Sequence, residues 1–183
     1  MRSVDGAIPF PEPRLAGPGF VLRAFEAADH AAAHELEQDP AAARWVPPLP
    51  AGDGPGVVDF YERCRVDGDL LHLVIADSVS GTYLGETMVA VGEHGVGEVG
   101  CCVVPAARGQ GIATGTLRAL TDWSFRTLGL GRVQVFVGTE NTAALRLAEA
   151  CGFRREGTLR GYWEEDGRRL DAIILARLPD DQA

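Results

Sequence analysis

Two kinds of hydrophobic pattern alternate along this chain and predict a protein built from strands and helices. Apolar runs bounded by Gly, Pro, Asp or Ser predict strands. These strands are expected at Phe20–Arg23, Leu70–Ala76, Tyr83–Val91, Glu98–Val104, Arg132–Val137, Arg154–Trp163 and Arg169–Leu178. Segments with the spacing of an amphipathic helix face predict helices. These helices are expected at Glu26–Gln38, Val57–Val66, Ile112–Leu128 and Thr142–Ala150.

The lengths of the connections predict how the strands pair. Short turns join the three strands between Leu70 and Val104, which favours an antiparallel meander. The strands Glu98–Val104 and Arg132–Val137 are joined through a helix, which favours parallel pairing by a right-handed crossover. The sequence therefore predicts an α/β fold of the mixed α+β kind, in which a mostly antiparallel central sheet is flanked by about four helices.

Composition and charge narrow the class of partner. The 183 residues are 46% hydrophobic and 23% charged, as in an ordinary globular protein. One domain is expected over 20–178, after a partly ordered lead-in at 1–19 and before a tail at 179–183. The net charge of −9 argues against a nucleic-acid partner, because a polyanion requires clustered Lys and Arg. It is compatible with a cationic substrate such as an amine.

The sequence also bears on the compartment and on metals. Met1–Arg14 has no apolar core flanked by basic residues, and no apolar run has the length of a membrane span. Four cysteines lack C-x-x-C spacing and are expected to be reduced thiols: Cys64, Cys101, Cys102 and Cys151. We therefore expect a cytoplasmic protein. His30 and His34 lie one helical turn apart, but no third ligand is near in sequence, so no metal site is expected.

A glycine-containing loop between a strand and a helix is the strongest functional signal. The apolar run ends at Pro105, Gly109 and Gly111 follow, and the helical pattern begins at Ile112. Glycines allow a close approach of the backbone, and the N–H groups and dipole at a helix N-terminus favour an anion. Arg108 offers a charge-assisted contact. The loop therefore predicts a cofactor that carries phosphate.

Two common phosphate-binding motifs fit this loop poorly. A P-loop requires a lysine, and none is near Gly111. A dinucleotide fold requires G-x-G-x-x-G, but the third position is Thr114, and Glu140 lies later than a ribose-binding acid would. The chain that remains after that strand predicts only a helix and a hairpin. A doubly wound sheet is therefore not expected, and a dinucleotide-dependent oxidoreductase remains a distant alternative.

The loop instead resembles a motif of the GCN5-related N-acetyltransferase (GNAT) superfamily. Arg108–Ala113 matches its Q/R-x-x-G-x-G/A motif, Gly97–Gly100 resembles the start of its fourth strand, and Asn141 begins a segment that ends at Gly152-Phe153. Further segments resemble the ribosomal-protein alanine acetyltransferase (RimJ/RimL-type) branch. They are Phe20–Arg23, Ala43–Trp45 and Asp166–Arg168 with Asp171. The resemblance covers Phe20–Leu178 and implies the GNAT acyl-CoA N-acyltransferase fold.

The resemblance implies acetyl-CoA (coenzyme A) as the acetyl donor. The pyrophosphate would lie on the loop backbone, formed by Arg108, Gly109, Gln110, Gly111, Ile112, Ala113 and Thr114. The pantetheine arm would pair with the backbone of Cys102, Val103 and Val104 like an added strand. The N–H of Cys102 would stabilise the oxyanion of the tetrahedral intermediate. Asn141 is expected to cap the next helix and, by the same resemblance, to contact pantetheine.

The remaining chemistry is the removal of a proton from the amine. Glu98 matches the position of the family's glutamate and is the first candidate base, directly or through a water, with Glu86 as an alternative. A covalent Cys102 nucleophile is disfavoured, because a buried Cys without a neighbouring base is inert. Family members frequently have Tyr and Ser at the positions of Ala148 and Ala144, so the acid that protonates the departing thiolate is missing.

We expect an N-acetyltransferase that acts on a protein N-terminal α-amine or on a small amine. Four aromatic residues are candidates for lining the acceptor site: Trp45, Tyr61, Tyr162 and Trp163. The alternative is a non-catalytic acyl-CoA-binding or sensor domain, which Ala144 and Ala148 favour. The branch also implies a homodimer. The sequence does not identify the acceptor, because acceptor loops vary most within a fold.

Overall fold

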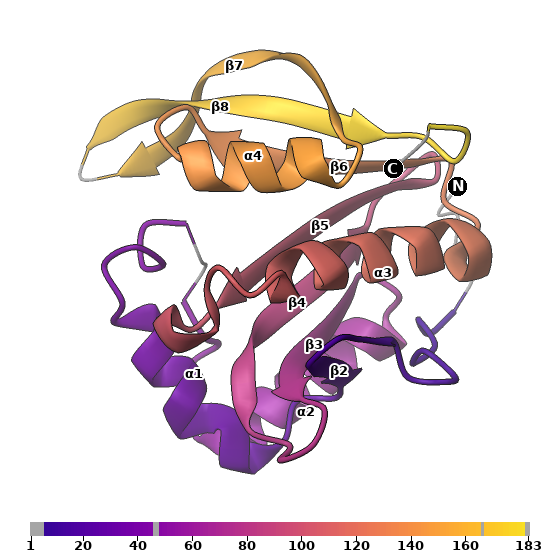
Figure 1. Ribbon diagram of the computed structural model, residues 1–183, viewed down its shortest axis with the longest axis vertical. Helices are drawn as coiled ribbons and strands as arrows, with labels where there is room; N and C mark the ends of the chain where they lie inside the picture. The colour runs from indigo at the N-terminus through magenta and orange to yellow at the C-terminus, as the bar shows by residue number, and fades with distance from the viewer. Residues whose placement is uncertain (1–5, 46–47, 166, 182–183) are drawn as a thin grey trace.

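The computed structural model describes residues 6–45, 48–165 and 167–181 (Figure 1). The strands are β1 (Ala16–Gly17), β2 (Phe20–Arg23), β3 (Leu70–Asp77), β4 (Tyr83–Val91), β5 (Val96–Val103), β6 (Arg132–Gly138), β7 (Arg154–Glu165) and β8 (Arg168–Arg177). The helices are α1 (His30–Glu37), α2 (Gly54–Val66), α3 (Ile112–Leu128) and α4 (Thr142–Ala150), with 3-10 turns at Ala27–Asp29 and Pro105–Ala107. The predicted order of elements is confirmed, and only the short strand β1 was not predicted. None of the helices in these ranges is both long and apolar enough to cross a bilayer.

The strands form one mixed sheet in the order β1-β2-β3-β4-β5-β6-β8-β7. All neighbours are antiparallel except β5 and β6, which are parallel as predicted. Their pairing extends from Val96–Arg132 to Glu98–Gln134 and ends there, although both strands continue. Figure 1 shows the consequence: the sheet divides into a half that carries β2 to β5 and a half that carries β6 to β8.

Helices cover both faces of the sheet. The helix α3 buries Leu117, Leu120 and Trp123 in the larger core, and α1 and α2 pack on the opposite face. The helix α2 begins at Gly54 rather than at Val57 as predicted. The reason is a helix cap, because the Asp53 side chain accepts a hydrogen bond of 3.0 Å from the N–H of Gly56.

The segment before β1 packs against α2. Ile8 is completely buried, its N–H donates to the carbonyl of Arg65, and the Arg65 guanidinium donates back to the carbonyl of Ile8 at 2.7 Å. The same guanidinium lies 4.8 Å from the centre of the Phe10 ring. Residues 6–10 therefore help to close the side of the molecule where α2 meets β3.

Close packing between α3 and β2 explains why a glycine stands at position 115. A Cβ at Gly115 would lie 2.7 Å from the Phe20 ring, which is 1% exposed. A side chain at this position of α3 would therefore displace β2 from the helix.

A prediction concerns Gly85, at the irregular part of the β3–β4 pairing. Its φ is +148°, and a Cβ there would lie 2.1 Å from the carbonyl oxygen of Cys102 on β5. Gly85→Ala should lower the free energy of unfolding by about 2 kcal/mol or more, through backbone strain and overpacking. The control is Gly100→Ala on β5, where the nearest atom lies 3.6 Å away. Urea unfolding of both variants measures the difference, and equal loss in both would contradict this account.

Candidate functional site

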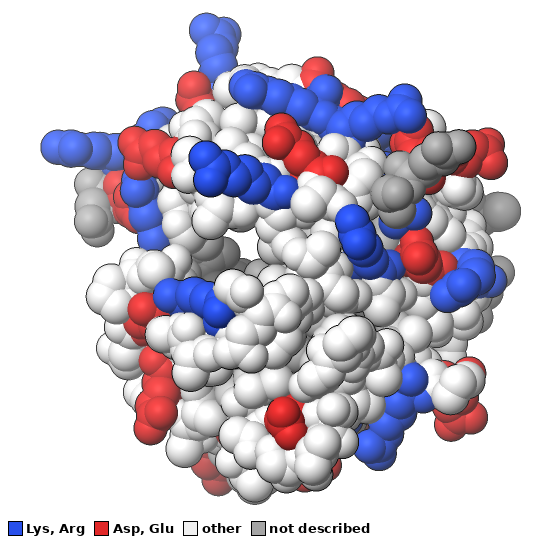
Figure 2. Space-filling model, viewed as in Figure 1, with Lys and Arg blue, Asp and Glu red and all other residues white. Residues whose placement is uncertain are grey.

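The glycine loop forms an open cradle at the N-terminal end of α3. Gly109 and Gly111 have φ values of +74° and +78°, and the first helical bond joins the N–H of Gly115 to the carbonyl of Gly111. The N–H groups of the first turn therefore have no intrahelical acceptor, and Gly111 provides no side-chain cap. A hollow of about 280 Å³ adjoins these groups, and it is lined by Val103, Ala107, Arg108, Gly109, Gly111, Ile112, Ala113 and Thr114. Figure 2 shows this face of the molecule hollowed above the N-terminal end of α3. The loop residues therefore fit a phosphate group.

The polar side chains of the loop are bound to the protein itself. The Arg108 guanidinium pairs with Asp39, which follows α1, and this contact holds the pKa of Asp39 below its usual range. The Nε of Arg108 also donates to the carbonyl of Val103 at 3.3 Å. The Gln110 amide donates to the carbonyl of Ala106 at 2.7 Å. The cradle therefore offers backbone N–H groups, and the predicted contact from Arg108 would require the Asp39 pair to open.

Beyond Glu98, β5 and β6 are no longer paired, and a gap opens between them. The register of β5 determines which of its backbone groups face this gap. Val104 donates to Leu84 at 2.9 Å, and Val96 accepts from Gly92 at 2.8 Å, so both residues direct their backbone groups toward β4. Backbone direction alternates along a strand, so the N–H of Cys102 also points to β4. Cys101 and Val103 alternate with Cys102 and Val104. Their backbone N–H groups therefore point to the other side of β5, from which β6 has separated.

This register revises two of the backbone contacts expected from the sequence. The N–H of Cys102 is directed at β4, and that of Val104 is bonded to Leu84, so neither faces a ligand between β5 and β6. The N–H of Val103 faces the gap, as expected. The N–H of Cys101 also faces it, and sequence reasoning missed that residue. No sequence signal could reveal which alternate residues of β5 face the gap, because this depends on the alignment of β5 with β4.

The cysteines near the gap are protonated thiols at neutral pH. Burial raises the pKa of Cys101 to about 12 and that of Cys102 to about 11. Cys101 packs on the side of α3, where its thiol contacts the carbonyl of Ala113. A thiol held in this form is a weak nucleophile, which argues against covalent catalysis by Cys102.

Glu98 lies where the pairing of β5 and β6 ends. It is half-buried, and burial raises the pKa of its carboxyl group. The pKa of Tyr162, on β7, is raised by burial and then by the charge of Glu98, so the two groups interact. The Tyr162 ring stacks on Phe136 of β6, with ring centroids 4.8 Å apart. The charge of Glu98 therefore acts on a stacked pair of aromatic rings, Tyr162 and Phe136.

Aromatic contacts connect the segment after α1 with the β7–β8 hairpin. The rings of Trp45 and Trp163 are 6.0 Å apart, and Trp163 contacts Tyr162. Arg44 pairs with Glu140 at 2.7 Å and with Glu165 at 2.9 Å. Three of the four aromatic residues expected at the acceptor site are thus brought together.

The fourth aromatic residue belongs to a separate cluster on the same face of the sheet. Tyr61 of α2 stacks on His72 of β3, and His72 is hydrogen-bonded to Glu86 of β4 at 2.8 Å. The phenol of Tyr83 donates to the other oxygen of Glu86 at 2.7 Å. Sequence reasoning named Glu86 and Tyr61 but not His72 or Tyr83.

Asn141 caps α4, as predicted. Its side-chain oxygen accepts a hydrogen bond of 3.0 Å from the N–H of Ala144. That bond leaves the amide nitrogen and the second lone pair of the oxygen for a contact with pantetheine. Ala148 is the buried residue of this helix, and its methyl side chain has no proton to donate.

Known proteins share this fold and parts of the sequence. N-acetyltransferase p20 of Bacillus licheniformis is 33% identical over 107 residues, which cover 58% of this chain and 59% of that protein. A spermidine N(1)-acetyltransferase of Vibrio cholerae is 33% identical over 78 residues, which cover 43% of this chain and 45% of that protein. The chain thus spans about half the length of the curated relatives it matches.

A solved structure aligns over more of the chain. RimJ of Mycobacterium smegmatis, in complex with CoA-disulfide, superposes with a TM-score of 0.74 at 25% identity. The alignment covers 87% of this chain and 81% of that one. The family model described as an acetyltransferase (GNAT) domain matches residues 20–154, more than half of the chain. With its divided sheet and its glycine cradle, the chain belongs to the GNAT acetyltransferase family.

Proposed function

We propose that this protein is an N-acetyltransferase that transfers acetyl from acetyl-CoA to a primary amine. The observation that carries the proposal is the open edge of β5, which leads from Glu98 past Cys101 and Val103 to the glycine cradle. A strand edge accepts an extended ligand through backbone hydrogen bonds, and the cradle suits its phosphates. A pantetheine arm ending in a pyrophosphate has these two parts in this order.

The same edge supplies the groups for acyl transfer. We assign the stabilisation of the oxyanion to the N–H of Cys101 or Val103, because these groups face the gap. Glu98 takes a proton from the amine through a water. The water is needed because Glu98 precedes Cys101 by three residues, or about 10 Å of strand. The departing thiol has a pKa of about 8.5, like that of free cysteine, so it leaves without a dedicated acid.

The acceptor is a protein N-terminal α-amine or a small amine. An α-amine has a pKa of about 7.7–8.0 and is partly neutral at physiological pH, whereas a lysine amine at about 10.4 is almost entirely protonated. The charge of Glu98 acts on Tyr162, whose ring contacts Trp163, and this combination suits an ammonium group, since aromatic faces and carboxylates both attract cations. One relative is a spermidine acetyltransferase and one structural neighbour is RimJ, so both acceptor classes belong in the assay.

The proposal is tested by mixing the purified protein with acetyl-CoA and an amine panel. The panel contains an alanyl tetrapeptide amide, spermidine and N-acetyl-lysine amide, and thiol release is followed by a chromogenic disulfide. The chain contains no lysine, so acetylation of its own side-chain amines does not add to the signal. Tight CoA binding without thiol release would favour the non-catalytic alternative, and absence of both would overturn the proposal.

The glycine cradle gives a prediction with an internal control. Gly111 and Gly129 begin and end α3, with φ values of +78° and +66° and open space around each. Alanine at either position should cost about 1 kcal/mol of stability. Only Gly111→Ala should weaken CoA binding, by tenfold or more, because it disturbs the backbone at the phosphate. Calorimetric titration with CoA measures this, and equal affinities in the two variants would exclude the cradle as the phosphate site.

Glu98→Gln tests the base. The change should lower kcat/KM by about 10²-fold or more. Because burial raises the pKa of Glu98, its base form is lost at a higher pH than that of an exposed glutamate. The wild-type rate should therefore fall as the pH decreases through that raised pKa, and the variant should lack this fall. The control is Glu93→Gln in the β4–β5 turn, 79% exposed, which should behave as wild type. A Glu98→Gln profile identical to wild type would remove Glu98 from the mechanism.

A further inference from the structure

The cluster around Glu86 lies on the acceptor face of the sheet. Glu86 is paired directly with Cys102 across β4 and β5, so its side chain emerges beside that of Cys102. Cys102 lies between Cys101 and Val103, the two residues whose backbone faces the gap. Glu98 lies four residues earlier, about 13 Å along the strand. Glu86 is therefore the carboxylate placed opposite the segment where the proposed function puts the thioester.

Both oxygens of Glu86 are held by hydrogen bonds. His72 Nε2 lies 2.8 Å from one oxygen, and the Tyr83 phenol donates to the other at 2.7 Å. Burial and the charge of Glu86 raise the pKa of Tyr83, so the phenol keeps its proton and donates it. Each carboxylate oxygen can accept two hydrogen bonds, so both have room for a further donor. The group is oriented and still able to bind a ligand.

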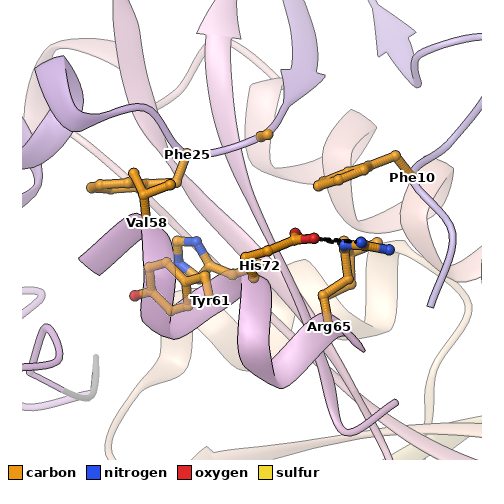
Figure 3. A pocket seen from close by; sticks show the side chains of 9 residues that line it. Phe10, Phe25, Val58, Tyr61, Arg65 and His72 are labelled. Carbon is orange, nitrogen blue, oxygen red and sulfur yellow. Dashed lines mark hydrogen bonds and ion pairs between the residues drawn. The ribbon is translucent and has the colours of Figure 1, made fainter. Parts of the chain in front are cut away.

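His72 is itself fixed by aromatic rings. Its ring is parallel to that of Tyr61 at 3.8 Å, and Phe25 contacts it edge-on at 6.0 Å. Figure 3 shows Tyr61 and His72 face to face, with Phe10 above Arg65 on the other side of a cavity of about 60 Å³. The cavity has room for water. The His72 ring therefore cannot turn away from Glu86.

The burial of this cluster is costly without a cationic partner. The side chains of Glu86 and His72 are 12% and 9% exposed, and His72 Nδ1 has no hydrogen-bond partner among the described residues. The nearby guanidinium of Arg108 is paired with Asp39. A buried carboxylate is stable when a charge faces it, and an ammonium group that enters the acceptor site would supply one. An apolar pair at these positions would pack without this cost.

We infer that Glu86, held in place by His72 and Tyr83, binds the ammonium form of the acceptor and takes its first proton. This rests on the proposed function. The net reaction is R–NH3⁺ + CH3CO–S–CoA → R–NH–CO–CH3 + CoA–SH + H⁺. Glu86 takes one proton from nitrogen and returns it to solvent. The freed lone pair forms the C–N bond and the C–S bond breaks. The second proton leaves nitrogen through water to Glu98, and the thiolate takes a proton from solvent. His72 and Tyr83 are positioning residues.

Several titratable groups surround Glu86 and enter the interpretation of a pH profile. They are His72 on β3, Tyr83 on β4, Cys102 on β5, Tyr61 on α2, and Glu37, Asp39 and Arg108 beyond them. Cys102, Tyr61 and Tyr83 have raised pKa values and stay protonated at pH 7 to 9. A change that depends on Glu86 is therefore identified by comparing variants rather than by one profile.

The test compares Glu86→Gln with Glu62→Gln. Glu62 also lines the small cavity, but it is 48% exposed and bound to Arg65. With the fastest amine of the panel, Glu86→Gln should reduce kcat/KM about 100-fold at pH 7. Its rate should then rise about tenfold per pH unit up to the pKa of the amine, because only the neutral amine still reacts. Glu62→Gln should match wild type. A Glu86→Gln enzyme with wild-type rates, or one slowed equally at every pH, would overturn the inference and leave the proposed function standing.

A second pair of variants tests the positioning role. His72→Phe keeps a ring against Tyr61 and removes the donor to Glu86, whereas His72→Gln keeps a donor. The phenylalanine variant should show the pH-dependent loss of Glu86→Gln in weaker form, and the glutamine variant should restore most of the rate. Equal rates in both variants would overturn the role of His72.

A binding measurement separates this inference from the proposed function. Calorimetry with spermidine and with the alanyl peptide amide, in the presence of CoA, is carried out on wild type, Glu86→Gln and Glu62→Gln. The wild type could release no thiol while Glu86→Gln alone loses amine affinity by tenfold or more. That result would overturn the proposed function and support Glu86 as an amine-binding residue. If no variant differs in amine affinity and no thiol is released, both are overturned.

Discussion

The unpaired edge of β5 is the constraint on which the rest of this structure depends. A strand inside a sheet normally has hydrogen-bond partners on both sides, and β5 loses its partner on one side after Glu98. Beyond that point, the backbone groups of β5 that face away from β4 have no strand to pair with, and the carbonyl of Val103 accepts a hydrogen bond from Arg108 instead. The separation of β6 from β5 produces this unpaired edge, and the gap continues to the start of α3. The fold thus leaves one edge of β5 available for backbone hydrogen bonds.

The elements around the gap explain how it is kept open. Packing of Gly115 against Phe20 holds α3 on the half of the sheet that contains β5, and α4 packs with β6 and β7 on the other half. Gly85 allows β4 to approach the Cys102 carbonyl closely, which keeps β5 paired with β4. Ion pairs from Arg44 to Glu140 and Glu165 join the segment after α1 to the second half. The two halves share one continuous core, which runs from Val99 of β5 to Val133 of β6, and the ion pairs of Arg44 add a connection beside the site.

Two carboxylates with different surroundings lie on the same face of the β4–β5 pair. Glu98 is half-buried beside Tyr162, and burial raises its pKa. Glu86 is nearly buried and has both oxygens hydrogen-bonded by His72 and Tyr83. Acetylation of an ammonium group removes two protons from nitrogen, and two bases in unlike environments suit two separate transfers.

The sequence by itself determined the order of elements, the parallel pairing of β5 and β6, and the cradle at Gly109 and Gly111. These follow from local periodicity, connection length and the special backbone of glycine, which need no knowledge of distant contacts. Tertiary structure decided the rest. The alignment of β5 with β4 turned Cys101 and Val103, rather than Cys102, toward the gap. The pairing of β3 with β4 brought together His72, Tyr83 and Glu86, which share no sequence motif. Strand register is set by contacts between distant segments, so local pattern cannot determine it.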